Sequence, residues 1–162
     1  MDVKYINPFI IATQTTFKTM FSTELKLNKP ILKQDRRTSG DITGIMGLAG
    51  DKKGTLCVSF NERGALYLYS LLVGEKYEKV TSEIVDSIGE LTNIISGQSR
   101  KEFEKIGLNL SAAIPMVIVG KNVELNFITV TPIVSVPFAF SLSNGDIDFI
   151  NLDFSFEDAG SK

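Results

Sequence analysis

The sequence of 162 residues contains no histidine. Without an imidazole, the chain cannot build the Ser-His-Asp or Cys-His systems of nucleophilic catalysis, and it lacks the usual ligand of catalytic zinc sites. Phosphate-loop motifs are missing as well. Neither G-x-G-x-x-G nor G-x-x-x-x-G-K-[ST] occurs in the glycine-rich segment 40–50, and a strand rather than a helix is expected to follow it.

Cysteine is nearly absent, because Cys57 is the only one in the chain. A single thiol excludes an intrachain disulfide and a thiolate cluster for metal, which fits a reducing cytoplasm. Cys57 stands between Leu56 and Val58 in a strand-like run. This position favours a buried, inert thiol over a nucleophile.

An excess of positive charge is also missing, since the net charge is −2 and the pI is about 5.2. Proteins that bind phosphate backbones need a basic surface, so we expect no nucleic-acid partner. Lys33, Arg36 and Arg37 form a tight basic cluster in the first half of the chain, but Asp35 and Asp41 dilute it. A solvated loop or edge strand accounts for this cluster.

No stretch approaches the 18 or so uninterrupted apolar residues of a membrane span, because Pro132, Ser135 and Pro137 interrupt the longest apolar segments. Residues 1–12 hold a short apolar run broken by Asn7-Pro8, unlike the continuous apolar region of a signal peptide. We therefore expect no membrane span, no export and a cytoplasmic location.

Apolar residues are plentiful enough for a compact core. Hydrophobic residues make up 43% of the chain and charged residues 22%, proportions typical of a globular domain rather than of disorder. A chain of this length can bury about 70% of its unfolded surface without disulfides or metal. We predict a single domain over residues 1–157 and a flexible C-terminal tail over residues 158–162.

Three segments show the spacing and caps of helices. The first is predicted to begin at Asn7-Pro8, with the asparagine as the cap and the proline in the first helical position, and to run to about Ser22. The second begins after Asn61 and stops at Gly74. The longest begins at Thr81 or Ser82 and ends at a cap near Gly107.

Most of the remaining sequence is strand-like. Strands are predicted over residues 31–38, 43–48, 55–60, 116–119 and 123–130, with a turn at residues 51–54.

A long apolar hairpin closes the chain around the turn signal Asn144-Gly145. Its arms alternate through Val134, Val136, Phe138, Phe140 and Leu142, and through Ile150, Leu152, Phe154 and Phe156. Residues 146–149 are out of phase with the return arm, which predicts a bulge near Phe149-Ile150. Pro137 predicts an edge or bulge position, and the hairpin is a candidate for a strand-mediated dimer.

The most informative segment is residues 86–97 of the longest helix. At about 100° per residue, one narrow stripe of this helix holds Asp86, Glu90, Asn93 and Gly97. An almost opposite stripe is apolar: Ile84, Ile88, Leu91 and Ile95. Gly89 and Gly97 each cost about 1 kcal/mol of helix stability relative to alanine, which indicates a surface that a partner approaches closely. A solvated polar face explains the same spacing without a function.

Glu90 and Asn93 are neighbours on this helix and point toward the same region. A carboxamide cannot abstract a proton, but it can hold a water molecule, as a glutamine does in GTP-hydrolysing switches. Such a site suits hydrolysis of an activated phosphoryl group, with the carboxylate as a docking charge for a cation on the partner. Asp86 and Glu90 are a poor glycosidase pair, because carboxyls on one helix face do not stand across a cleft.

At these residues the chain resembles the CheC/CheX/FliY family of phosphatases, which dephosphorylate the chemotaxis response regulator CheY. The family motif is an acidic residue or serine, three residues, Glu, two residues, Asn, and a proline a little over twenty residues later. Asp86, Glu90, Asn93 and Pro115 match it. The motif occurs once, as in the CheX branch. Three further segments are similar to CheX-type members: residues 5–9, 40–44 and 90–97.

The resemblance implies an α/β (α+β) fold with long helices packed on an antiparallel β-sheet, and a homodimer. It also implies a protein aspartyl-phosphate phosphatase whose partner is a phosphorylated CheY-type receiver. In this interpretation Asn93 orients the attacking water, Glu90 pairs with the receiver's active-site lysine, and Asp86 and Gly97 contact the partner. The resemblance also implies that Mg²⁺ belongs to the receiver. This chain shows no clustered carboxylates that demand a divalent ion, and we expect no cofactor of its own.

Two other functions remain open. A non-catalytic interaction domain, similar to flagellar switch components, would bind a receiver without hydrolysing it, although the presence of both Glu90 and Asn93 argues against this. A small-ligand sensor is supported only by the large apolar β region, which is more often core.

Overall fold

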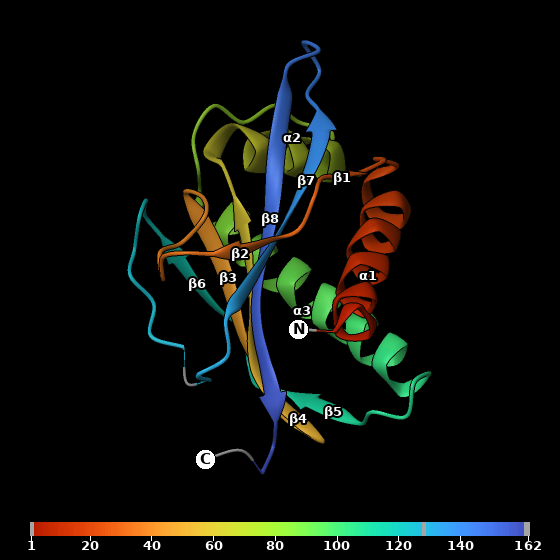
Figure 1. Ribbon diagram of the computed structural model, residues 1–162. Coiled ribbons are helices and arrows are strands. Elements are labelled where there is room, and N and C mark those ends of the chain that lie inside the picture. The colour runs from red at the N-terminus through yellow and green to blue at the C-terminus, as the bar shows by residue number, and fades with distance from the viewer. Residues whose placement is uncertain (1, 128, 161–162) are drawn as a thin grey trace.

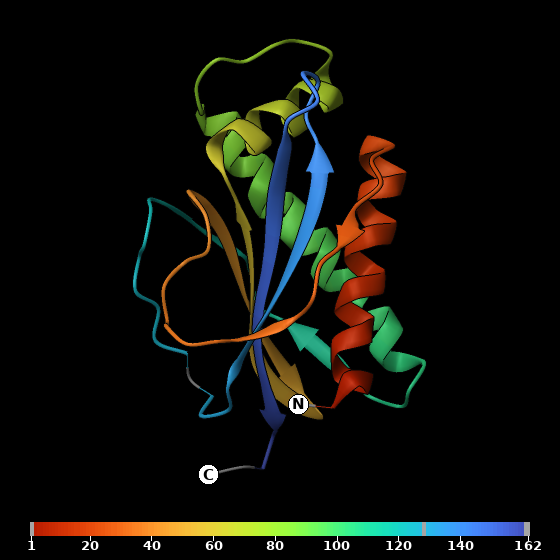
Figure 2. The same cartoon turned by 45° about the horizontal axis from the view of Figure 1, so that its top comes forward.

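A computed structural model describes residues 2–127 and 129–160, and Figures 1 and 2 show it from two directions. Three helices are present in the described part: α1 (Val3–Phe21), α2 (Glu62–Val73) and α3 (Ser82–Glu104). The strands there are β1 (Lys26–Leu27), β2 (Ile31–Lys33), β3 (Ile42–Gly50), β4 (Lys52–Phe60), β5 (Leu110–Ala112), β6 (Met116–Val119), β7 (Ile133–Ser141) and β8 (Ile147–Asp158).

The strands form one antiparallel sheet in the order β1-β7-β8-β4-β3-β5, with β2 also paired to β7 and β6 also paired to β3. In both views α3 crosses one face of this sheet, and α1 lies alongside α3 (Figures 1 and 2). The predicted fold class, long helices packed on an antiparallel sheet, is therefore confirmed.

An aromatic cluster joins the two long helices to the sheet. The ring of Phe9 on α1 lies 5.2 Å from that of Phe103 on α3 and 4.4 Å from that of Phe154 on β8. Phe103 in turn lies 5.2 Å from Phe156. All four side chains are buried, and aromatic pairs at these distances add stabilisation beyond the apolar area that they bury. The cluster fixes α3 against α1 and β8.

Helix α1 begins earlier than the sequence predicts. It starts at Val3, with Asp2 as the N-cap, whose carboxylate accepts a hydrogen bond from the Lys4 backbone N–H at 3.1 Å. The assignment of Asn7-Pro8 as the helix start is therefore wrong, because Pro8 lies inside the helix. Tyr5 and Ile6 pack against the core, and this burial extends the helix upstream of the proline.

Two predicted strands are shorter or absent. The run 31–38 forms only β2, and 123–130 forms no strand in its described part apart from a single bridge between Glu124 and Arg37. Backbone hydrogen bonds join this second segment to the loop after β2, because the Thr38 N–H donates to the Val123 carbonyl at 2.9 Å and the Leu125 N–H donates to the Arg36 carbonyl at 2.7 Å. Further along, the Val130 N–H donates to the Glu157 carboxylate at 3.2 Å. Ile128 lies outside the described residues.

Strand β4 is longer than predicted, and β5 was not predicted. Lys52 and Gly54, expected in a turn, are paired with Asp158 and Phe156 of β8. The long partner strand extends the ladder to these residues, which turn propensity alone does not show. Strand β5 covers Leu110–Ala112 and pairs with the last residues of β3.

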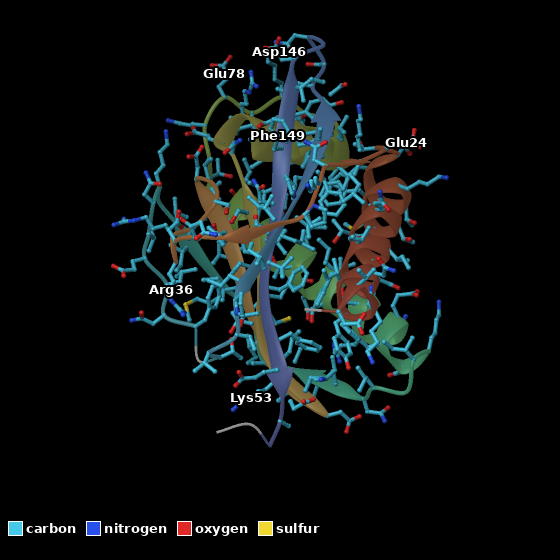
Figure 3. All side chains as sticks on the ribbon, in the orientation of Figure 1. Glu24, Arg36, Lys53, Glu78, Asp146 and Phe149 are labelled. Atoms are coloured by element: carbon cyan, nitrogen blue, oxygen red, sulfur yellow. The ribbon has the colours of Figure 1, made fainter. Side chains whose placement is uncertain are left out.

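The β7–β8 ladder runs without a bulge from Val134↔Phe154 to Ser141↔Ile147, so the bulge predicted near Phe149-Ile150 is wrong. Asp148 occupies the inward position instead. It is 2% exposed and accepts a hydrogen bond from the Asn61 amide at 2.7 Å. Phe149, labelled on β8 in Figure 3, is 39% exposed. The alternation is intact, but a hydrogen-bonded carboxylate takes a place where the pattern expects an apolar residue.

Pro137 lies on β7 between the residues that pair with β2 and those that pair with β1. On the outer side of β7, β2 pairs with residues 133–135 and β1 with residues 138–139, while the Pro137 carbonyl accepts from the Asn28 N–H at 2.9 Å. The missing N–H of Pro137 therefore costs no ladder bond. Because β8 is internal and β7 is largely covered, the hairpin offers little free edge, and the expected dimer contact along it is not supported.

The C-terminal residues extend β8 further than expected. Asp158, which the sequence assigns to the tail, is the last residue of β8 and forms an ion pair with Lys52. Residues 161–162 of the predicted tail lie outside the described residues. The single domain over residues 1–157 stays a prediction.

Helix α3 approaches the sheet most closely at Gly44. A Cβ atom added there would lie 1.9 Å from Thr92 Oγ1 and 2.9 Å from Thr92 Cβ. Thr92 is buried, and its hydroxyl donates to the Ile88 carbonyl at 2.8 Å. Glycine at position 44 therefore sets the distance between α3 and β3.

We predict that Gly44→Ala lowers the free energy of unfolding by about 1–3 kcal/mol, the usual cost of overpacking a core. Gly47→Ala on the same strand is the matched control, because its Cβ would meet only Ala113 at 3.9 Å. Urea unfolding of both variants measures the difference. Equal stability of the two variants would show that α3 does not depend on this close approach.

Candidate active site

Helix α3 carries the candidate site and is anchored along one face. Thr81 caps its start, with the side-chain oxygen accepting from the Ile84 N–H at 3.4 Å. The apolar stripe predicted from the sequence is buried: Ile84, Ile88, Leu91 and Ile95. Phe103, near the end of the helix, is buried as well. Ile106 follows the end of the helix and is exposed.

The opposite stripe faces outward. Asp86, Glu90 and Asn93 are exposed, and Gly97 is half-buried. These residues span about 16 Å of helix at 1.5 Å per residue. Among the described residues, no side chain bonds or pairs with Asp86, Glu90 or Asn93. Their polar groups are therefore available to a second molecule.

The two glycines of this region differ in role. Gly89 is buried, and a Cβ there would lie 3.3 Å from Val117 Cγ2 on β6. The expectation that Gly89 opens a surface to a partner is wrong, since it allows α3 to pack against β6. Gly97 meets no such neighbour: the nearest atom to an added Cβ is the Arg100 Nη2, at 3.8 Å.

Pro115 of the motif lies between β5 and β6, immediately before β6. Val117, two residues later, faces Gly89 of α3. The residues between Asn93 and Pro115 are thus the rest of α3, the turn after it and β5.

An apolar cavity of about 200 Å³ opens beside Asp86 and Glu90. Helices α1, α2 and α3 line it, with apolar contributions that include Met20, Phe21, Leu68, Leu72 and Leu91. Solvent screens a charge less next to apolar protein than in open water. A cation brought to Glu90 would therefore be attracted more strongly once a partner covers this region.

The sequence reasoning missed Arg100. The spacing that selects Asp86, Glu90, Asn93 and Gly97 reaches Arg100 three residues later, within roughly 40° of Asp86 around the helix axis. The helical spacing alone would therefore have placed Arg100 on the same stripe as Gly97.

The described residues include neither a group placed to bind a metal nor a helix that could span a membrane. No group of three or more His, Cys, Asp or Glu side chains among them is placed to hold a metal ion. None of the helices in this part of the chain has the length and apolar content that a membrane crossing requires.

Comparison with known families shows the family to which the chain belongs. The family model described as chemotaxis phosphatase CheX matches residues 42–139, more than half of the chain, including α3 and the strands beneath it. The chain belongs to the CheX family.

Individual relatives agree with this CheX assignment. The chain is similar to the CheY-P phosphatase CheX of Thermotoga maritima, with 25% identity over 126 residues that cover 77% of this chain and 81% of the relative. A CheC-like superfamily protein from Shewanella sp. PV-4 is 33% identical, with a TM-score of 0.82 over 96% of this chain and 99% of that one. A chain of the CheX-CheY-BeF3-Mg²⁺ complex from Borrelia burgdorferi is 26% identical, with a TM-score of 0.77 over 95% and 98%.

Cys57 lies on β4, away from the exposed stripe of this CheX-family chain. It is buried, as predicted, and burial raises the pKa of its thiol to about 12, with a further contribution from Asp153. Because the thiolate is the nucleophile, a thiol with this pKa is almost unreactive near neutral pH.

We predict that Cys57 is protected in the folded protein. Near pH 8 only about one thiol in 10,000 would be ionised at this pKa, so a disulfide reagent should label the native protein far more slowly than the protein unfolded in guanidinium chloride. Absorbance of the released thiol measures both rates. Rapid stoichiometric labelling of the native state would contradict the buried position.

Proposed function

We propose that this protein hydrolyses the phospho-aspartate of a CheY-type receiver by inserting α3 into the receiver's active site. The observation that carries the proposal is the exposed pair Glu90 and Asn93 on one stripe of α3, without partners among the described residues. Membership of the CheX family supports the reaction class.

In this proposal Asn93 positions the water that attacks phosphorus. Its carboxamide donates to the water oxygen or accepts a water hydrogen, and holds the oxygen in line with the bond to be broken. A new oxygen–phosphorus bond forms as the bond between phosphorus and the aspartyl oxygen breaks, releasing inorganic phosphate and regenerating the carboxylate. The acyl phosphate is already activated, so positioning is the main requirement, and no strong base is needed.

Glu90 supplies the docking charge. Its carboxylate, one helical turn from Asn93 and beside the apolar cavity, is placed to pair with the receiver's active-site lysine. Asp86 and Gly97 extend the contact at either end of the pair. The receiver supplies Mg²⁺; the name of the Borrelia burgdorferi complex includes CheX, CheY, BeF3 and Mg²⁺, which supports this arrangement. A receiver substrate also implies a cytoplasmic location.

The homodimer implied by the family resemblance is a further part of this proposal. Strands β5 and β6 each pair only with β3 in the described part of the sheet, so they form its open edge. Exposed apolar side chains follow this edge, among them Ile114 at 91% exposure, Met116 and Val119. Such an edge is a natural site for contact with a second copy.

We predict that Asn93→Ala slows protein-accelerated dephosphorylation by at least about 100-fold, because a misplaced nucleophile loses that much rate. The fold should be unaffected, since an exposed helical Asn→Ala change is structurally mild. The assay follows decay of the phosphorylated receiver with Mg²⁺ present. Asn126→Ala, an exposed asparagine outside α3, is the control. A wild-type rate from Asn93→Ala would remove Asn93 from the mechanism.

Glu90→Gln tests the docking charge separately. Loss of the carboxylate should raise the KM for the phosphorylated receiver about tenfold or more, because a charge-assisted pair is lost. Glu24→Gln, an exposed acid just after α1 in Figure 3, is the matched control and should leave KM unchanged. Steady-state rates over a range of receiver concentrations give KM and kcat. An unchanged KM in Glu90→Gln would exclude the proposed ion pair.

The alternative function is a binding module that holds the phosphorylated receiver without hydrolysing it. Such a protein would leave the lifetime of the phosphorylated receiver unchanged or lengthen it. The two functions therefore predict opposite effects on the same decay curve.

A further inference from the structure

Arg100 continues the stripe of α3 beyond Gly97, about two helical turns after Asn93, and it is half-buried. Its Nη2 lies 3.8 Å from where a Cβ of Gly97 would be. Gly97 lies one helical turn before Arg100 and about 6 Å along the axis from Asn93. The guanidinium therefore folds back over Gly97 toward Asn93, in the direction in which helical side chains lean. A side chain at position 97 would compete for this space.

The guanidinium has no partner among the described residues. Its Nε is buried and unsatisfied, and no described residue forms an ion pair or hydrogen bond with Arg100. Glu104, four residues later, is the usual kind of partner for a helical arginine, yet the side chain points the other way, toward Gly97. The protein encloses Nε, so the donors that an outside acceptor can reach are the terminal Nη groups of this half-buried side chain.

The charges on the stripe change sign along the helix. Asp86 and Glu90 are negative, Asn93 is neutral, Arg100 is positive, and Glu104 at the end of α3 is negative again. A surface that binds this stripe in one direction needs a cation opposite Glu90 and an anion opposite Arg100. In the reverse direction, like charges would face each other, and this penalty selects one orientation.

We infer that Arg100 is a docking residue that binds a carboxylate of the receiver at the rim of the receiver's active site and fixes the direction in which α3 enters. This inference rests on the proposed phosphatase function. A guanidinium suits the role because its planar donors bind a carboxylate in two-point fashion. Gly97 gives the guanidinium room to reach this carboxylate.

Charge reversal tests the inference. Arg100→Glu should raise the KM for the phosphorylated receiver about tenfold or more and change kcat less than about twofold, because the chemistry at Asn93 is untouched. Arg100→Lys should give an intermediate KM, because lysine keeps the positive charge but lacks the paired donors with which a guanidinium binds a carboxylate. Arg36→Glu is the matched control. It makes the same charge change at an exposed arginine of the loop after β2, labelled in Figure 3, and should leave both constants unchanged.

A second measurement identifies the acceptor. Each acidic residue at the rim of the receiver's active site is changed in turn to arginine, and one such receiver should restore the KM of Arg100→Glu to within about threefold of wild type. Failure of every exchange would overturn the inference, as would an unchanged KM in Arg100→Glu or a loss confined to kcat. These results differ from failure of the proposed function, in which the wild-type protein itself gives no acceleration.

Discussion

The close packing of α3 on the sheet is the constraint on which the rest of the structure depends. Gly44 lets Thr92 approach β3, and Gly89 lets α3 pack against Val117 of β6. With the helix seated at these two points, and with Phe103 joined to Phe9 on α1, its rotation about its own axis is fixed. The stripe with Glu90 and Asn93 then faces outward because the opposite side of α3 is buried against the rest of the protein.

This arrangement separates stability from function along a single helix. The buried stripe supplies apolar contacts, while the opposite stripe holds carboxylates, an amide and a guanidinium that have no partner among the described residues. Groups kept free in this way add little to folding, but they are ready to bind without first breaking an internal contact. A site on a rigid helix also holds Asn93 at a fixed distance from Glu90, as positioning of a water molecule requires.

The long periodic elements could be predicted from the sequence because their burial follows local spacing. The apolar stripe of α3 and the alternation of the closing hairpin are examples. Features that depend on distant partners could not be predicted in this way: Tyr5 and Ile6 extend α1 past Pro8 by packing on the core, and β8 draws Lys52 into β4. Asp148 looks out of place in a strand until its bond with Asn61 is known. At the site, spacing reveals the stripe, but only the structure shows that Gly89 is buried and that Arg100 turns toward Gly97.

The most direct test of the account is the lifetime of a phosphorylated CheY-type receiver mixed with a substoichiometric amount of this protein in the presence of Mg²⁺. The account predicts that one molecule of the protein dephosphorylates many receivers, so that the whole receiver pool decays faster than it does alone. Binding of the phosphorylated receiver with an unchanged or longer lifetime would contradict it, and would show that Glu90 and Asn93 recognise the receiver without hydrolysing it.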